Sequence, residues 1–212
     1  MAYINGKDVF GFLIGADHSE AYDAGKQAEY DRFWDNLQQN GNRTNYTYAF
    51  YQKAWTDEIY NPKYPINIEQ GNGVYNLSAI TDTKVPIDIT NCSSNGQVFQ
   101  YAQKMKTIRK LIIGENSVVP SALFGGCSAL ENITIEGVIV KSINFQWSTK
   151  LSRSSIESII FHLSLSVGKT LTLSKTAVDK AFETSEGANN GSLTGDWTYL
   201  EDYCADWEIL LV

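Results

Sequence analysis

The sequence predicts an α/β fold: a short solenoid with a parallel sheet, helices on the outer side of its C-terminal half, and an N-terminal hairpin-helix appendage. Two observations carry this prediction. Apolar-x-apolar pairs recur beyond residue 65, and the first steps between them are twenty-odd residues long. Such steps are typical of solenoids in which every turn contributes one short strand. We therefore divide the chain into an N-terminal segment, residues 1–64, and a solenoid, residues 65–212.

The chain begins with a hairpin signal that is followed by a helical one. Asn5-Gly6 stands between short apolar-containing flanks, which is a preferred sequence for a two-residue β-hairpin loop. Ser19 can then cap a helix that runs to about Gln39, where an Asn-Gly pair ends it.

This N-terminal segment is also rich in apolar side chains. A hairpin and one helix are too small to bury a core of their own, so these side chains need a cover. We predict that the segment mediates self-association, as in a homo-oligomer, or docks onto a larger assembly. The alternative, to which we give equal weight, is that the segment folds back as a cap on the first repeat turn. The residues predicted to dock are Phe10, Phe12, Tyr30, Phe33, Trp34 and Leu37.

Residues 46–64 are unusually aromatic. We favour a cap that covers the open end of the core, because aromatic side chains bury large areas. The alternative is an exposed binding surface. Its residues would be Tyr46, Tyr48, Trp55 and Tyr60.

From Pro65 onward the apolar pairs predict the strands. The pairs are Ile66/Ile68, Ile87/Ile89, Leu111/Ile113, Ile133/Ile135, Leu171/Leu173 and Ile209/Leu211. Their second members are 21, 24, 22, 38 and 38 residues apart (89−68, 113−89, 135−113, 173−135, 211−173). We expect the strands to stack as one parallel sheet, with the second members pointing into a single core.

Helices explain the two longer steps. A capping box of Ser154 and Glu157 predicts the start of the first helix. Ser174 is placed to cap the second, and residues 196–207 can form a third. The buried faces of the first two helices comprise Ile156, Ile159, Ile160, Leu163, Val178, Ala181 and Phe182.

A second pattern repeats within the turns. Phe124-x-x-Cys127-x-x-Leu130-x-x-Ile133 mirrors, 25 residues later, a series that begins at Phe99. This alignment differs by a few residues from that of the strand pairs, which predicts an insertion in one turn. We expect Phe124 and Leu130 in the core, and Cys127 buried and unpaired, since the chain has only three widely spaced cysteines.

Residues 123–137, "LFGGCSALENITIEG", resemble the BspA-type leucine-rich repeat, most closely over residues 108–137 and less over 66–107. The whole chain is also similar to small proteins of gut Firmicutes and their phages or prophages. The resemblance implies a leucine-rich-repeat-like solenoid that binds macromolecules at bacterial or viral surfaces and is not an enzyme.

Charge and hydropathy argue against two classes of partner, nucleic acids and the membrane interior. The net charge of −7 makes nucleic-acid binding unfavourable. No stretch approaches the length of a transmembrane helix, so we expect no membrane insertion. Asn5, Lys7 and Asp8 interrupt the first apolar run, which does not fit a signal peptide. We expect a virion or extracellular location.

Catalytic motifs are not evident. The two histidines, His18 and His162, belong to no metal-binding pattern, so we predict no metal and no cofactor. The Gly168-Lys-Thr sequence lacks the earlier glycine of a phosphate-binding loop and precedes a strand instead of following one.

The hypothesis is therefore a non-enzymatic binding or structural protein, phage or prophage encoded, that takes part in attachment to a bacterial surface or in virion assembly. Its partners would be a protein or glycan at that surface, or other virion proteins. The alternatives are a secreted gut-bacterial adhesin-like fragment and, in a different class, a glycan-active enzyme, which would need a pocket with two convergent carboxylates.

Overall fold

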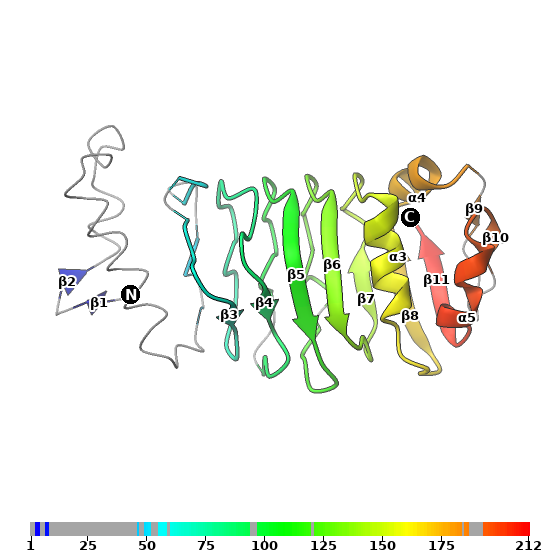
Figure 1. The fold of residues 1–212 in the computed structure, drawn as a ribbon, viewed down its shortest axis with the longest axis horizontal. Coiled ribbons are helices and arrows are strands. Elements are labelled where there is room, and N and C mark those ends of the chain that lie inside the picture. The colour runs from blue at the N-terminus through cyan, green and yellow to red at the C-terminus, as the bar shows by residue number, and fades with distance from the viewer. Residues whose placement is uncertain are drawn as a thin grey trace.

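The computed structural model describes residues 3–4, 7–8, 46, 49–51, 55–58, 60–93, 97–119, 121–183, 185–186 and 193–212. The fold is α/β, with parallel sheets arranged as a short β-solenoid and few helices, as predicted. Figure 1 shows the strands side by side along the long axis, with the helices at the C-terminal end.

The solenoid carries two parallel sheets where the sequence predicted one. The first has the order β3-β4-β5-β6 and the second the order β11-β8-β7. In Figure 1 the arrows of β5 and β6 run down the view and that of β11 runs up, so the sheets belong to different walls. The strands are β3 (Ile66–Asn67), β4 (Ile87–Asp88), β5 (Thr107–Ile113), β6 (Asn132–Gly137), β7 (Ile143–Phe145), β8 (Lys169–Leu173) and β11 (Trp207–Leu211).

One hydrophobic core nevertheless fills the solenoid. Its residues come from both sheets and from the helices. The predicted core positions Ile89, Ile113, Ile135 and Leu173 belong to it, and Leu211 packs against it partly buried. The prediction of a single core is confirmed.

The strand register corrects one predicted alignment. Leu111 pairs with Ile135, and Ile113 pairs with Gly137, so the assumed match of Ile113 to Ile135 is wrong by two residues. The 25-residue match of Ile108 to Ile133 is right. A β-bulge between Ile108 and Leu111 takes up the extra residue. Three residue steps of β5, from Ile108 to Leu111, lie opposite two steps of β6, from Ile133 to Ile135.

The later part of the solenoid contains a strand that the sequence analysis missed. β7 is itself an apolar-x-apolar segment, Ile143 and Phe145, and pairs with Leu171 and Leu173 of β8. The predicted 38-residue match between β8 and β11 is confirmed, since Leu171 pairs with Ile209.

Three helical segments replace strands in this part. α3 (Arg153–Phe161) begins at Ser152, whose Oγ accepts from the backbone N–H of Ser155. The predicted capping box is wrong, because Ser154 lies inside the first turn and Glu157 pairs with Arg153 instead. α4 (Lys175–Ala181) follows Ser174, and η2 (Thr198–Leu200) leads into α5 (Glu201–Cys204).

Two antiparallel hairpins flank the solenoid. β1 (Tyr3–Ile4) and β2 (Lys7–Asp8) confirm the predicted N-terminal hairpin. β9 (Ser185–Glu186) pairs with β10 (Thr194–Gly195) near the other end. The predicted helix from Ser19 to Gln39 lies outside the described residues. So do the predicted docking residues Phe10, Phe12, Tyr30, Phe33, Trp34 and Leu37.

The aromatic segment that precedes the first strand stacks onto the next turn. The N–H of Tyr46 donates to the carbonyl of Gln70 (2.7 Å), and that of Phe50 donates to Val74 (2.9 Å). Both donors lie 24 residues before their acceptors (70−46, 74−50), which is the step of the repeat. The segment therefore continues the solenoid toward its N-terminal end.

A ladder of buried rings runs through the core. We call Phe50, Tyr75, Phe99, Phe124 and Phe145 the inner ladder. Successive ring centroids lie 5.3, 5.3, 5.6 and 4.3 Å apart, and the rings from Tyr75 to Phe145 are stacked. Each turn contributes one ring at the same position, so the ladder fixes the register of the turns.

Candidate binding surface

The residues that we predicted as a binding surface are mostly in the core. Tyr46, Trp55 and Tyr60 are buried. Tyr60 donates to Thr83 O (3.0 Å) and bonds the hydroxyl of Tyr75 (2.7 Å), and burial raises its pKa well above the usual value. A binding role requires exposure, which these three side chains do not have. Tyr48 lies outside the described residues.

A different set of apolar side chains is exposed at one repeat position. Two residues after each ring of the inner ladder from Tyr75 onward stand Leu77, Tyr101, Gly126 and Trp147, which we call the outer column. Leu77 is 41% exposed, Tyr101 48% and Trp147 55%. Single exposed apolar residues are ordinary, but recurrence at one position of successive turns is not random scatter.

Backbone geometry links the first three turns of the outer column. The N–H of Leu77 donates to the carbonyl of Tyr101 (3.1 Å), and that of Tyr101 donates to Gly125 (2.6 Å). Leu77 and Tyr101 both have φ of 57°, and Gly126 has φ of 78°. All three turns therefore need the left-handed conformation at this position.

The left-handed conformation favours glycine, and only the third of these turns has one. A side chain with a Cβ costs roughly 1–2 kcal/mol there. Leu77 and Tyr101 thus occupy positions where glycine would be less strained. Backbone strain of this kind clusters at functional sites, which directs attention to the outer column.

Gly126 also makes room for a neighbouring ring. A Cβ on Gly126 would lie 2.8 Å from Cδ1 of Tyr101, closer than real contacts allow. The Tyr101 ring therefore lies over Gly126 and extends toward the turn that carries Trp147. The absence of a side chain at Gly126 is what makes room for this ring.

Amide side chains run beside the outer column. Asn76, Gln100 and Gln146 each precede an exposed member and are partly buried, with Gly125 at the equivalent position in the third turn. Amides offer both donors and acceptors. The surface therefore combines apolar rings with neutral hydrogen-bonding groups.

A second aromatic surface is formed by α3, η2 and α5. The rings of Phe161 and Tyr203 meet edge to face, with centroids 4.7 Å apart. The Arg153 guanidinium lies 5.8 Å from the centroid of Tyr199, whose hydroxyl donates to Glu157. Burial and this bond raise the pKa of Tyr199. The side chains of this surface satisfy one another.

The outer column differs in this respect. Among the residues that the structure describes, the rings of Tyr101 and Trp147 have no aromatic or cation–π partner. Their exposed faces are consequently available to a ligand, and we take the outer column as the candidate binding surface.

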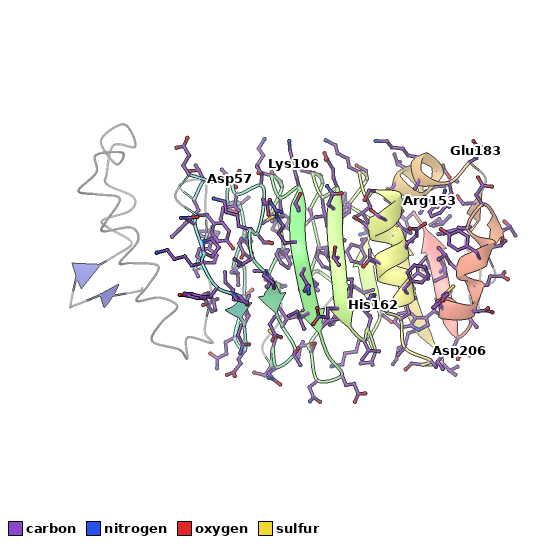
Figure 2. The ribbon with its side chains drawn as sticks, viewed as in Figure 1. Asp57, Lys106, Arg153, His162, Glu183 and Asp206 are labelled. Atoms are coloured by element: carbon purple, nitrogen blue, oxygen red, sulfur yellow. The ribbon has the colours of Figure 1, made fainter. Side chains whose placement is uncertain are left out.

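The described residues give little geometric basis for catalysis by paired carboxylates or for metal binding. A hollow of about 350 Å³ between the starts of β6 and α3 is lined by one carboxylate, Glu131, beside Lys150, Arg153 and Lys180. Figure 2 shows His162 well below Arg153 in this view, and its Nδ1 bonds to Ser158 O (2.7 Å). Within the described ranges no three His, Cys, Asp or Glu side chains are grouped to hold a metal ion.

Among the residues that the structure describes, no helix has both the length and the apolar character needed to cross a membrane. No protein-family model, curated protein or solved structure matches the chain. The resemblance to BspA-type leucine-rich repeats therefore stays a prediction that rests on the quoted residues.

The sequence contains a signal for the outer column. Aligning Phe124 with Phe99 also aligns Gly126 with Tyr101. Extending the alignment to Leu77 requires only Tyr75, but extending it to Trp147 requires β7, which was not foreseen because a helix already explained the long step after Ile135. The column was missed for that reason.

Proposed function

We propose that the protein is a non-enzymatic binding protein that attaches to a bacterial surface through the outer column. The observation that carries this proposal is the recurrence of exposed Tyr101 and Trp147 at one repeat position, Tyr101 on strained backbone. Large aromatic side chains are the commonest anchors of binding surfaces. Successive turns of a solenoid present such anchors to an extended partner.

The resemblance to BspA-type repeats supports a bacterial surface as the target and a phage or prophage as the source of the gene. Virion assembly and a secreted adhesin-like fragment are the alternative settings. Each of them would use the same surface, so the binding test does not depend on which one applies.

The test is co-sedimentation of the purified full chain with intact cells of a panel of gut Firmicutes. We expect binding to some strains, weakened about tenfold or more by Tyr101→Ala or Trp147→Ala, as for truncated interface anchors. Tyr203→Ala is the matched control, because Tyr203 is 47% exposed but lies on α5.

Three outcomes would contradict the proposal. They are binding to no strain, equal binding by all variants, and release of cleaved material from the cells by the wild-type chain. Circular dichroism melts of each variant verify that a loss of binding is not a loss of folding.

A further inference from the structure

Two turns of the outer column share a longer pattern than one exposed ring. Tyr101 is followed three residues later by Lys104, and Trp147 by Lys150. The two pairs are 46 residues apart (147−101 and 150−104), which corresponds to two turns. The intervening turn has Gly126 and Ala129 at these positions. The surface thus presents two pairs of a ring and a lysine, with the Tyr101 ring lying over Gly126 of the turn between them.

The spacing of the two pairs suits a polymer with a regular repeat. Hydrogen-bonded neighbours in a parallel stack lie about 4.8 Å apart, so two turns span roughly 10 Å. This is close to the length of an extended disaccharide unit. The backbones of the two pairs are thus about a disaccharide apart, and the Tyr101 ring lies across Gly126 toward Trp147, so neighbouring sugars of one chain can meet the two rings.

Neither of the two lysines has an acidic partner, a property that they share with Lys106 and Lys180 among the described residues. Lys104 and Lys150 are exposed, and within the described residues neither ammonium group forms an ion pair. Other cations of the solenoid do, for example Arg109 with Asp82 and Lys110 with Glu136. In a chain of net charge −7, two unpaired lysines beside exposed rings make a local site of complementary charge for an anion.

On the basis of the proposed function, we infer that the ligand is an acidic glycan chain. Its sugar rings stack on Tyr101 and Trp147, and the carboxylate or phosphate groups that it carries pair with Lys104 and Lys150. Single-stranded nucleic acid also stacks on aromatic rings, but it requires a cationic groove along its backbone, and this surface offers two lysines.

The experiment is isothermal titration of the full chain with four polymers. Polygalacturonate carries carboxylates, a purified wall teichoic acid carries phosphates, a mixed-linkage β-glucan is neutral, and poly-dT is the nucleic acid. We expect binding to one or both acidic glycans, weakened by added salt, and at least about tenfold weaker binding to the other two polymers.

Charge-matched variants test whether Lys104 and Lys150 pair with the anionic groups of the glycan. Lys104→Gln and Lys150→Gln should each weaken binding several-fold, whereas Lys106→Gln, which makes the same change of charge two residues after Lys104, should not. Figure 2 shows Lys106 at the upper edge of the solenoid. Trp147→Phe should retain most of the binding that Trp147→Ala loses, and it guards against misfolding of the alanine variant.

Equal binding of the neutral glucan, tighter binding of poly-dT, or an equal effect of Lys106→Gln would overturn the inference. So would failure to bind either acidic glycan when intact cells are still captured through Tyr101 and Trp147. That last result would leave the proposed function standing, whereas binding to neither cells nor glycans would remove both.

Discussion

The two halves of the solenoid build the same core with different walls. In the half from β3 to β6, residues 66–137, a strand of every turn adds to one parallel ladder. In the half from β7 to β11, residues 143–211, α3 and α5 alternate with the strands of the second sheet. We call them the strand-walled and the helix-walled half.

The junction between the halves shows how a helix can end a sheet inside a solenoid. Strand β6 is the last of its sheet, so its outward N–H groups need acceptors. Ser155 and Ser158 of α3 supply them: their Oγ atoms accept from the N–H groups of Ile133 and Ile135, both at 2.9 Å. Side-chain hydroxyls thus take over the role of the next strand's carbonyls.

The change from the strand-walled to the helix-walled half also determines how far the outer column extends. Its first three members follow the inner ladder through the strand-walled half, and Trp147 follows β7 at the start of the other half. Beyond Phe145 no further ring continues the stack among the described residues, and Trp197 and Trp207 fill the core instead. The column therefore ends where the repeat changes its wall.

The largest expected effect is the loss of a ring from the inner ladder. Phe124→Ala should destabilise the protein by roughly 3–5 kcal/mol, because Phe124 is fully buried and stacked on Phe99 and Phe145. Urea unfolding measures this. Phe161→Ala, which removes a 43% exposed ring from the helix-walled half, is the control. Equal losses in both variants would mean that the ladder is not what holds the strand-walled half together.

The next effect concerns the junction. Ser155→Ala should cost roughly 1–3 kcal/mol, because it leaves the N–H of Ile133 buried without an acceptor. Ser154→Ala removes an exposed hydroxyl one residue earlier and should be near neutral. Hydrogen exchange at the amide of Ile133 should accelerate in the first variant only. Unchanged exchange would show that α3 does not close the sheet through this bond.

A smaller effect is expected at alkaline pH. Burial raises the pKa of the Cys127 thiol from 9.0 to about 12, although a backbone hydrogen bond with Ala102 acts to lower it, and the thiol donates to Phe99 O (2.9 Å). A raised folded-state pKa favours the protonated fold, so the stabilisation is complete below pH 9 and is lost as the pH rises toward 12. Between pH 9 and 10 the wild type should lose about 1 kcal/mol more than Cys127→Ala.

Unfolding free energies at the two pH values measure this difference, and slow labelling of Cys127 by a thiol reagent at pH 8 should accompany it. The prediction fails if both proteins lose the same stability, or if the folded protein is labelled at the rate of a free thiol.

The smallest effect on stability is expected in the outer column, where its sign is informative. Tyr101→Gly relieves the left-handed strain at φ of 57° but removes the ring over Gly126, so the net change should lie within about 1 kcal/mol. Binding should nevertheless be lost. Thermal melts and the co-sedimentation assay separate the two effects, and strong destabilisation would assign Tyr101 a structural role instead.

Local patterns in the sequence were sufficient to predict a parallel solenoid with C-terminal helices, a single core and the Asn5-Gly6 hairpin. The burial of Phe124 and Cys127 followed from the same repeat. These features depend on periodicity, because apolar pairs at a fixed step can be buried only against neighbouring turns. Such information is contained in short stretches of chain.

Only the tertiary structure decided the rest. The division into two sheets depends on hydroxyls of Ser155 and Ser158 that reach a strand more than twenty residues earlier. The register at the β5 bulge depends on which residues meet across turns, and a two-residue slip leaves the sequence pattern almost unchanged. Exposure of Tyr101 and Trp147, and burial of Tyr46 and Tyr60, likewise depend on which face of a turn each ring occupies, and composition does not encode it.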